Sequence, residues 1–178
     1  MSCNNMTTIE LDGYIFSVDI EKTREYYQKQ EFCECPNCRN CYAQIKDAFP
    51  LLGEFLKKFG ADIGKPDNIE SYDDDDGKTI NYLSTDYTVC GKIVTMGEYE
   101  IDIKDSQFLS ITVINDFASP NRQGDNDYFT LCVNFFEFPW VLDEEFPLTV
   151  RLPADTETHI AIDTASKIRN FFRRLFRR

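Results

Sequence analysis

The sequence lacks the short motifs that mark the common enzyme classes. It contains no Gly-x-Ser-x-Gly elbow, no phosphate-binding loop, no Gly-x-Gly-x-x-Gly fingerprint and no His-Glu-x-x-His motif. Its single histidine, His159, has no identifiable nucleophile to activate, so we expect a surface residue there. A non-catalytic protein is the leading interpretation, although a carboxylate pair among the 31 acidic residues would leave no sequence signature.

Long hydrophobic runs are also missing. No stretch approaches the ~18 apolar residues of a membrane span. The first residues, Met-Ser-Cys-Asn-Asn-Met, have neither the basic nor the apolar region of a secretory signal. We therefore expect a cytoplasmic protein. Its 178 residues and hydrophobic fraction of 42% suit an ordered domain that folds without disulfides.

Positive charge is scarce outside the C-terminal segment. The formal net charge is −12, and residues 164–178 carry six Lys and Arg with no Asp or Glu, which leaves −18 on residues 1–163. Such an acidic surface repels phosphate backbones. We expect no nucleic-acid binding by the main body.

The segment 164–178 predicts a basic amphipathic helix, because its apolar residues share one helical face and its cations occupy the other. This pattern is typical of a helix that lies on a membrane surface or in the groove of a protein partner. The alternative is a helix that docks on the acidic body of its own chain. The apolar face consists of Ile168, Phe171, Phe172, Leu175 and Phe176.

Sequence periodicity predicts an α+β protein with a single domain over 1–163. Its main part is a largely antiparallel β-sandwich or curved sheet from 8–20 and 69–152, with an N-terminal helical insertion over about 20–60. Asp12-Gly13 predicts a hairpin turn, Asp19 an N-cap, Pro50 a helix start and Gly60 a helix end. Further strands are predicted at 69–72, 79–89, 92–94, 99–104, 108–115, 128–138 and 148–152.

Alternating residues in these strands predict which side chains are buried. Tyr99, Ile101 and Ile103 alternate with charged residues. A second buried set consists of Phe129, Leu131, Val133 and Phe135. The stretch 64–67, Gly-Lys-Pro-Asp, has the composition of a linker.

Four of the seven cysteines, Cys33, Cys35, Cys38 and Cys41, lie within nine residues. Cys35-x-x-Cys38 has the spacing of a zinc knuckle, and Cys38 and Cys41 are three apart at the start of a predicted helix. We predict that these four residues are metal ligands and that the metal is zinc. Four ligands from so short a stretch are uncommon. Three local thiolates with a distant ligand are easier to build, and the candidates are Cys90, Cys132 and His159.

Other interpretations of the cysteines stay open. Cys35-Pro36-Asn37-Cys38 at a helix start resembles the dithiol of thioredoxin-like proteins, which favours a thiol redox protein that uses Cys35 and Cys38. The triple repeat also matches part of an iron–sulfur motif, but the Cys-Pro continuation is absent. The simplest alternative is a set of reduced cysteines without a cofactor.

The stretches 25–40, 87–93 and 139–144, the first with Cys-x-Cys-Pro-x-Cys-Arg-Asn, resemble a group of uncharacterised bacterial proteins. The similarity extends to about residue 153 and excludes the basic segment. The resemblance implies a bacterial cytoplasmic protein and no activity. The sequence as a whole predicts a binding or interaction module with a structural metal site. The alternatives are a thiol redox protein and a peripheral membrane adaptor that uses the C-terminal helix.

Overall fold

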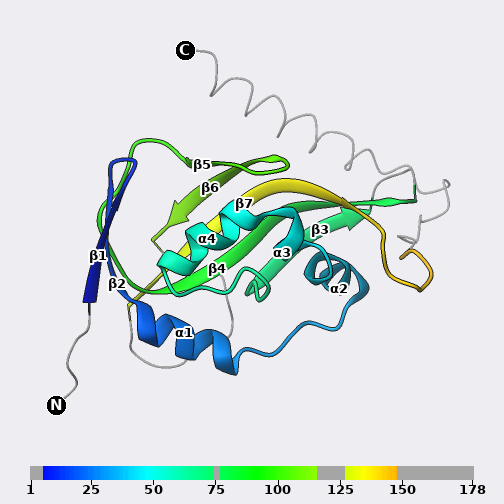
Figure 1. Cartoon of the computed structure of the whole chain (residues 1–178), viewed down its shortest axis with the longest axis horizontal. Coiled ribbons are helices and arrows are strands. Elements are labelled where there is room, and N and C mark those ends of the chain that lie inside the picture. Colours follow the sequence, from blue (N-terminus) through cyan, green and yellow to red (C-terminus); the bar gives the residue numbers. More distant parts are fainter. Residues whose placement is uncertain (1–5, 74–76, 116–126, 148–178) are drawn as a thin grey trace, which may run out of the picture. The chain divides into compact units, whose positions relative to one another are not determined.

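A computed structural model describes residues 6–73, 77–115 and 127–147 of the chain. All of these residues belong to one compact unit, Met1–Leu148. They form a seven-stranded sheet and four helices (Figure 1). The predicted strand 148–152, the domain boundary at 163 and the helix 164–178 lie outside the described residues and stay predictions.

The sheet confirms the prediction of a mainly antiparallel β protein. Every pairing recorded within the described ranges is antiparallel. The strands are β1 (Met6–Leu11), β2 (Tyr14–Asp19), β3 (Asn68–Asp73), β4 (Thr79–Thr95), β5 (Ile101–Lys104), β6 (Phe108–Ile114) and β7 (Tyr128–Pro139). Their order is β1-β2-β4-β7-β6-β5, and β3 also pairs with β4. The long strand β4 therefore contacts three other strands.

The prediction of two strands at 79–89 and 92–94 is wrong, because β4 runs through Gly91 without a break. At this residue the pairing changes from β7, where Cys90 faces Tyr128, to β2, where Gly91 faces Val18. Gly91 has φ 152°, and a Cβ there would lie 2.3 Å from the carbonyl oxygen of Ser17. The glycine is thus required for close approach of two backbones and does not mark a turn.

The predicted alternation fails at Phe135. Phe129, Leu131 and Val133 are fully buried as expected, but Phe135 is 53% exposed. Its φ of 33° interrupts the extended backbone, so the next buried aromatic residues are Phe136 and Phe138. Successive side chains point to opposite faces of a sheet only while the backbone stays extended.

Two other apolar residues are also exposed. Leu83 lies opposite Phe135, between the pairs Tyr82–Phe136 and Ser84–Asn134, and is 46% exposed. The predicted burial of Tyr99 is also wrong, because β5 begins only at Ile101 and Tyr99 is 73% exposed.

The helical insertion is present as α1 (Ile20–Lys29), α2 (Pro36–Tyr42), α3 (Ile45–Ala48) and α4 (Pro50–Lys58). Its predicted signals are confirmed: Asp19 accepts a hydrogen bond from the Lys22 amide at 3.1 Å, and Gly60 has φ 84° after α4. One cap comes from outside the insertion. Asp105 accepts hydrogen bonds from the amides of Leu51 (3.1 Å) and Leu52 (2.8 Å).

Aromatic side chains join the helices to the sheet. The ring of Phe49 lies 5.2 Å from that of Phe136 and 5.3 Å from that of Phe138, and Phe59 contacts Phe16 at 5.3 Å. Such contacts add to the burial of large apolar surfaces. Within the part of the chain that the structure describes, no helix combines the length and apolar character needed to cross a bilayer.

The stretch 64–67 is not a linker. The carboxylate of Asp67 accepts hydrogen bonds from the Thr88 amide (2.8 Å), the Gln30 side chain (3.1 Å) and the hydroxyl of Tyr26. These bonds tie the C-terminal end of α1 to β4. They fix the position from which the chain enters its cysteine-rich stretch.

Candidate metal centre

Three of the predicted ligands lie together at the start of α2. The Sγ atoms of Cys33, Cys35 and Cys38 are all within 4.8 Å of one another. We call these residues the three-cysteine group. Cys33 and Cys35 are exposed, whereas Cys38 is buried. The group is thus open to solvent on one side and enclosed by protein on the other.

Local backbone geometry explains why these residues converge. Cys35 precedes Pro36 and is extended, with φ −66° and ψ 149°, as residues before proline prefer to be. Pro36 then opens α2, because its fixed φ suits the first helical turn. The amide of Arg39 donates to the Cys35 carbonyl at 3.1 Å, which closes that turn and brings the side chain of Cys38 back toward Cys35.

The thiols differ in acidity because their surroundings differ. Hydrogen bonds from the Cys35 backbone amide, and then from the Cys35 thiol, lower the pKa of Cys33. Burial, and then the neighbouring Cys35, raises the pKa of Cys38. Because the three thiols interact, their titration is a property of the group and not of each residue alone. The lowered pKa of Cys33 means that the first thiolate forms at the exposed end of the group. A metal cation favours the deprotonated form of all three.

The donor set suits a thiophilic metal. Zinc binds thiolates at ~2.3 Å, so sulfur atoms around a tetrahedral zinc lie about 3.8 Å apart. The separations of up to 4.8 Å in the three-cysteine group are about 1 Å longer than this, a difference that rotation of the exposed side chains can close. The group supplies three ligands, and a structural zinc usually has four.

The other predicted ligands lie elsewhere. Cys41 is fully buried in the hydrophobic core and is not part of the group. The Cys90 amide donates to the Thr23 hydroxyl at 3.0 Å, and the Cys132 thiol donates to the Asn134 side chain at 3.6 Å. Among the described residues, neither Cys90 nor Cys132 belongs to the three-cysteine group. His159 lies outside the described residues. Metal binding by Cys41 therefore stays a prediction.

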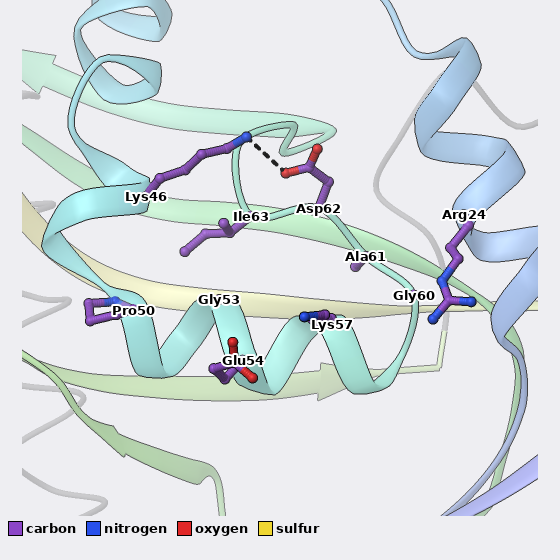
Figure 2. Close-up of a pocket in the computed structure, with 10 residues that line it drawn as sticks. All are labelled: Arg24, Lys46, Pro50, Gly53, Glu54, Lys57, Gly60, Ala61, Asp62 and Ile63. Carbon is purple, nitrogen blue, oxygen red and sulfur yellow. Dashed lines mark ion pairs between the residues drawn. The ribbon is translucent and has the colours of Figure 1, made fainter.

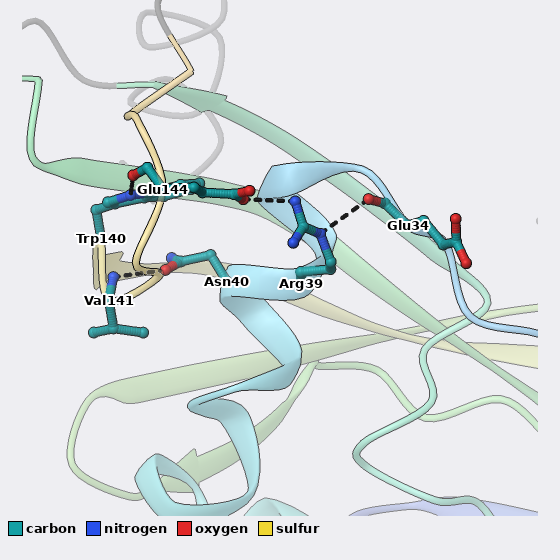
Figure 3. Close-up of polar contacts among 6 residues, drawn as sticks. All are labelled: Glu34, Arg39, Asn40, Trp140, Val141 and Glu144. Carbon is teal, nitrogen blue, oxygen red and sulfur yellow. Dashed lines mark hydrogen bonds and ion pairs between the residues drawn. The ribbon is translucent and has the colours of Figure 1, made fainter.

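Charged and aromatic side chains surround the group. Arg39 donates to the Glu34 carbonyl oxygen at 3.0 Å and pairs with Glu144 at 2.6 Å (Figure 3). Its guanidinium brings a positive charge close to Cys35. On the other side, burial and the nearby Cys38 raise the pKa of Tyr42, so this phenol stays neutral. A cation therefore lies near Cys35 and a neutral phenol lies near Cys38.

Asn40 attaches α2 to the end of β7. Its side-chain amide donates to the Tyr82 hydroxyl and to the Pro139 carbonyl oxygen, both at 3.1 Å. Its carbonyl oxygen accepts from the Val141 amide at 2.9 Å (Figure 3). The role of Asn40 was not predicted from the sequence. The available signal was an asparagine inside a helix, where it is unfavourable unless its side chain is bonded elsewhere.

Comparison of the chain with protein-family models, with curated proteins and with solved structures finds no match. The resemblance to bacterial proteins therefore stays a prediction. The chemistry open to the three-cysteine group follows from its own geometry: three sulfur ligands that can hold a metal ion.

Proposed function

We propose that the three-cysteine group holds a structural metal ion, with zinc the best match, in a non-catalytic binding module. The observation that carries this proposal is the convergence of three Sγ atoms within 4.8 Å at the junction of α1 and α2. Thiolates from neighbouring turns suit a metal that stabilises a fold.

The location explains what the metal would stabilise. Asn40 holds α2 to the sheet, and Asp67 holds the end of α1. Between these two anchors, residues 30–34 have no regular secondary structure. A metal bound by Cys33 and Cys38 would fix this connection, which would otherwise depend on contacts such as the ring pair Phe32–Tyr42 at 5.2 Å.

The test is metal analysis of protein purified without added metal, combined with titration of its thiols. We expect about one zinc per chain, and loss of the metal from the variant with Cys33→Ser, Cys35→Ser and Cys38→Ser. Cys90→Ala is the matched control, because Cys90 lies outside the group and should leave the metal content unchanged.

Each of three results would contradict the proposal. A structural metal would be excluded if the folded protein contains no metal and all three thiols of the three-cysteine group react with a thiol reagent. A reversible disulfide between Cys35 and Cys38 in such protein would favour the thiol redox alternative. Visible absorption that disappears on acid treatment would instead indicate an iron–sulfur cluster.

A peripheral membrane adaptor is the second candidate. The sequence observation that favours it is the apolar face of 164–178, with Phe171, Phe172 and Phe176, opposite six cations. Sedimentation with anionic liposomes should carry down the full chain and leave a variant without residues 165–178 in solution. Equal sedimentation of both proteins would exclude this role.

A further inference from the structure

The helical part of the chain differs in charge from the remainder of the main body. Residues 20–65 contain eight Lys and Arg against seven Asp and Glu, a net charge of +1. Since residues 1–163 carry −18, the rest of that range carries −19. An anionic ligand would be repelled least by the helical part of this surface.

A pocket of ≈ 470 Å³ lies in this part (Figure 2). Three cationic side chains line it, each from a different element: Arg24 from α1, Lys46 from α3 and Lys57 from α4. Two carboxylates, Glu54 and Asp62, also line it. Its volume falls within the range of about 300–1,000 Å³ that is usual for small-molecule sites.

The cations differ in how far they are already neutralised. Arg24 pairs with Glu21 at 2.5 Å, and Lys46 pairs with Asp62 at 3.4 Å. Both pairs are solvent-exposed and hence weak. Lys57 has no ion-pair partner among the residues that the structure describes, so its charge is available to a ligand.

Gly53 provides an independent observation. It lies inside α4 and lines the pocket, although glycine disfavours helix formation. Packing does not require it, because an added Cβ would lie 3.6 Å from the side chain of Ile63, an ordinary van der Waals contact. The absence of a side chain leaves the surface of α4 open at the pocket.

We infer that this pocket binds a small phosphorylated molecule that carries hydroxyl groups. A phosphate dianion can pair with the ammonium of Lys57, which no ion pair among the described residues neutralises, and Lys46 and Arg24 add positive charge to the lining of the same pocket. Hydroxyl groups can donate to Glu54 and Asp62, the carboxylates in the same pocket. This site is separate from the three-cysteine group, whose residues do not line the pocket.

Isothermal titration calorimetry of the full chain with ribose 5-phosphate tests the inference, with ribose and inorganic phosphate as separate probes. We expect ribose 5-phosphate to bind more tightly than either. Lys57→Met should raise its Kd by about tenfold or more, the effect of losing one charge-assisted hydrogen bond. Lys58→Met is the matched control, since Lys58 follows on the same helix and does not line the pocket.

A second pair of variants separates charge from size. Gly53→Glu places a carboxylate on the pocket side of α4 and should abolish binding, whereas Gly53→Gln adds the same bulk without charge and should weaken binding less. Equal loss in both Gly53 variants, equal loss in the Lys57 and Lys58 variants, or ribose and inorganic phosphate binding as tightly as ribose 5-phosphate would overturn the inference. None of these outcomes depends on metal at the cysteines.

Discussion

The described cysteines occupy two different settings. Cys33 and Cys35 lie at the surface beside Cys38, whereas Cys41, Cys90 and Cys132 are buried and separate from this group. Neighbouring amide and thiol donors lower the pKa of Cys33, while burial raises the pKa of Cys41. The thiols of one chain therefore differ in both exposure and pKa.

The difference shows what decides the role of a cysteine. A metal must replace protons on several converging thiols, and this is possible only where the ionised form is accessible and the sulfur atoms are close. A thiol surrounded by apolar side chains acts as a small hydrophobic residue. Spacing in the sequence does not distinguish the two, since Cys38 and Cys41 are only three residues apart.

The largest expected effect is that of metal removal. A ligand at a thousandfold excess over its Kd stabilises the folded state by about 4 kcal/mol. Chelation should therefore lower the melting temperature of the metal-loaded protein by ~10 °C, at about 2–4 °C per kcal/mol for a chain of this size. The measurement is thermal unfolding with and without chelator.

The variant with serine at positions 33, 35 and 38 is the control for this experiment. Because it has no ligands in the three-cysteine group, its melting temperature should not respond to the chelator. An equal response in the variant would place the metal elsewhere and remove the distinction between the two sets of cysteines.

Cys41→Ser should have the next largest effect. The substitution puts a hydroxyl group into a fully buried apolar position and should cost ~2 kcal/mol in unfolding free energy. The metal content should be unchanged. Denaturant unfolding and metal analysis check these two results, with Cys35→Ser in metal-free protein as the exposed control. Loss of metal from Cys41→Ser would instead make Cys41 a ligand.

Thiol reactivity should separate the two settings without mutation. In metal-free protein, Cys33 should be alkylated first, because its lowered pKa provides thiolate at a lower pH than an ordinary thiol. The rate should rise with pH, and the midpoint of this rise should lie at a lower pH than for an ordinary thiol. Peptide mapping after brief alkylation at several pH values provides the measurement. Faster labelling of Cys90 or Cys132 than of Cys33 would contradict the difference between the exposed and the buried cysteines.

The smallest expected effect concerns Arg39. The ion pair between Arg39 and Glu144 is solvent-exposed, so Arg39→Ala should leave the melting temperature unchanged within error. Thermal unfolding of the variant checks this expectation, and a clear fall in melting temperature would show that the pair helps to hold α2 against the segment after β7.

Local signals predicted much of the fold. The hairpin at Asp12-Gly13, the cap at Asp19 and the helix starting at Pro50 depend on residues close in sequence, and all three are confirmed. The long-range features could not be inferred in this way. Asp105 caps a helix that begins 55 residues earlier, and Gly91 is required by Ser17 on another strand.

The candidate site was predictable in part for the same reason. The local signal is Cys35-Pro36 at the start of α2, where the extended backbone before proline and the first helical turn bring Cys35 and Cys38 together. The burial of Cys41 depends on which face of α2 meets the sheet, and Asn40 determines this through bonds to Tyr82 and Pro139. No local pattern contains that information.

The position of β4 has a consequence for biosynthesis. Its longest pairing is with β7, which ends at Pro139, while the helices that cover the sheet lie before residue 60. As the chain emerges from the ribosome, α4 and its aromatic residues are therefore complete long before Phe136 and Phe138 can contact Phe49. Because such contacts between distant residues form late, the part of the helical segment's apolar face that packs on β7 stays uncovered until β7 is synthesised.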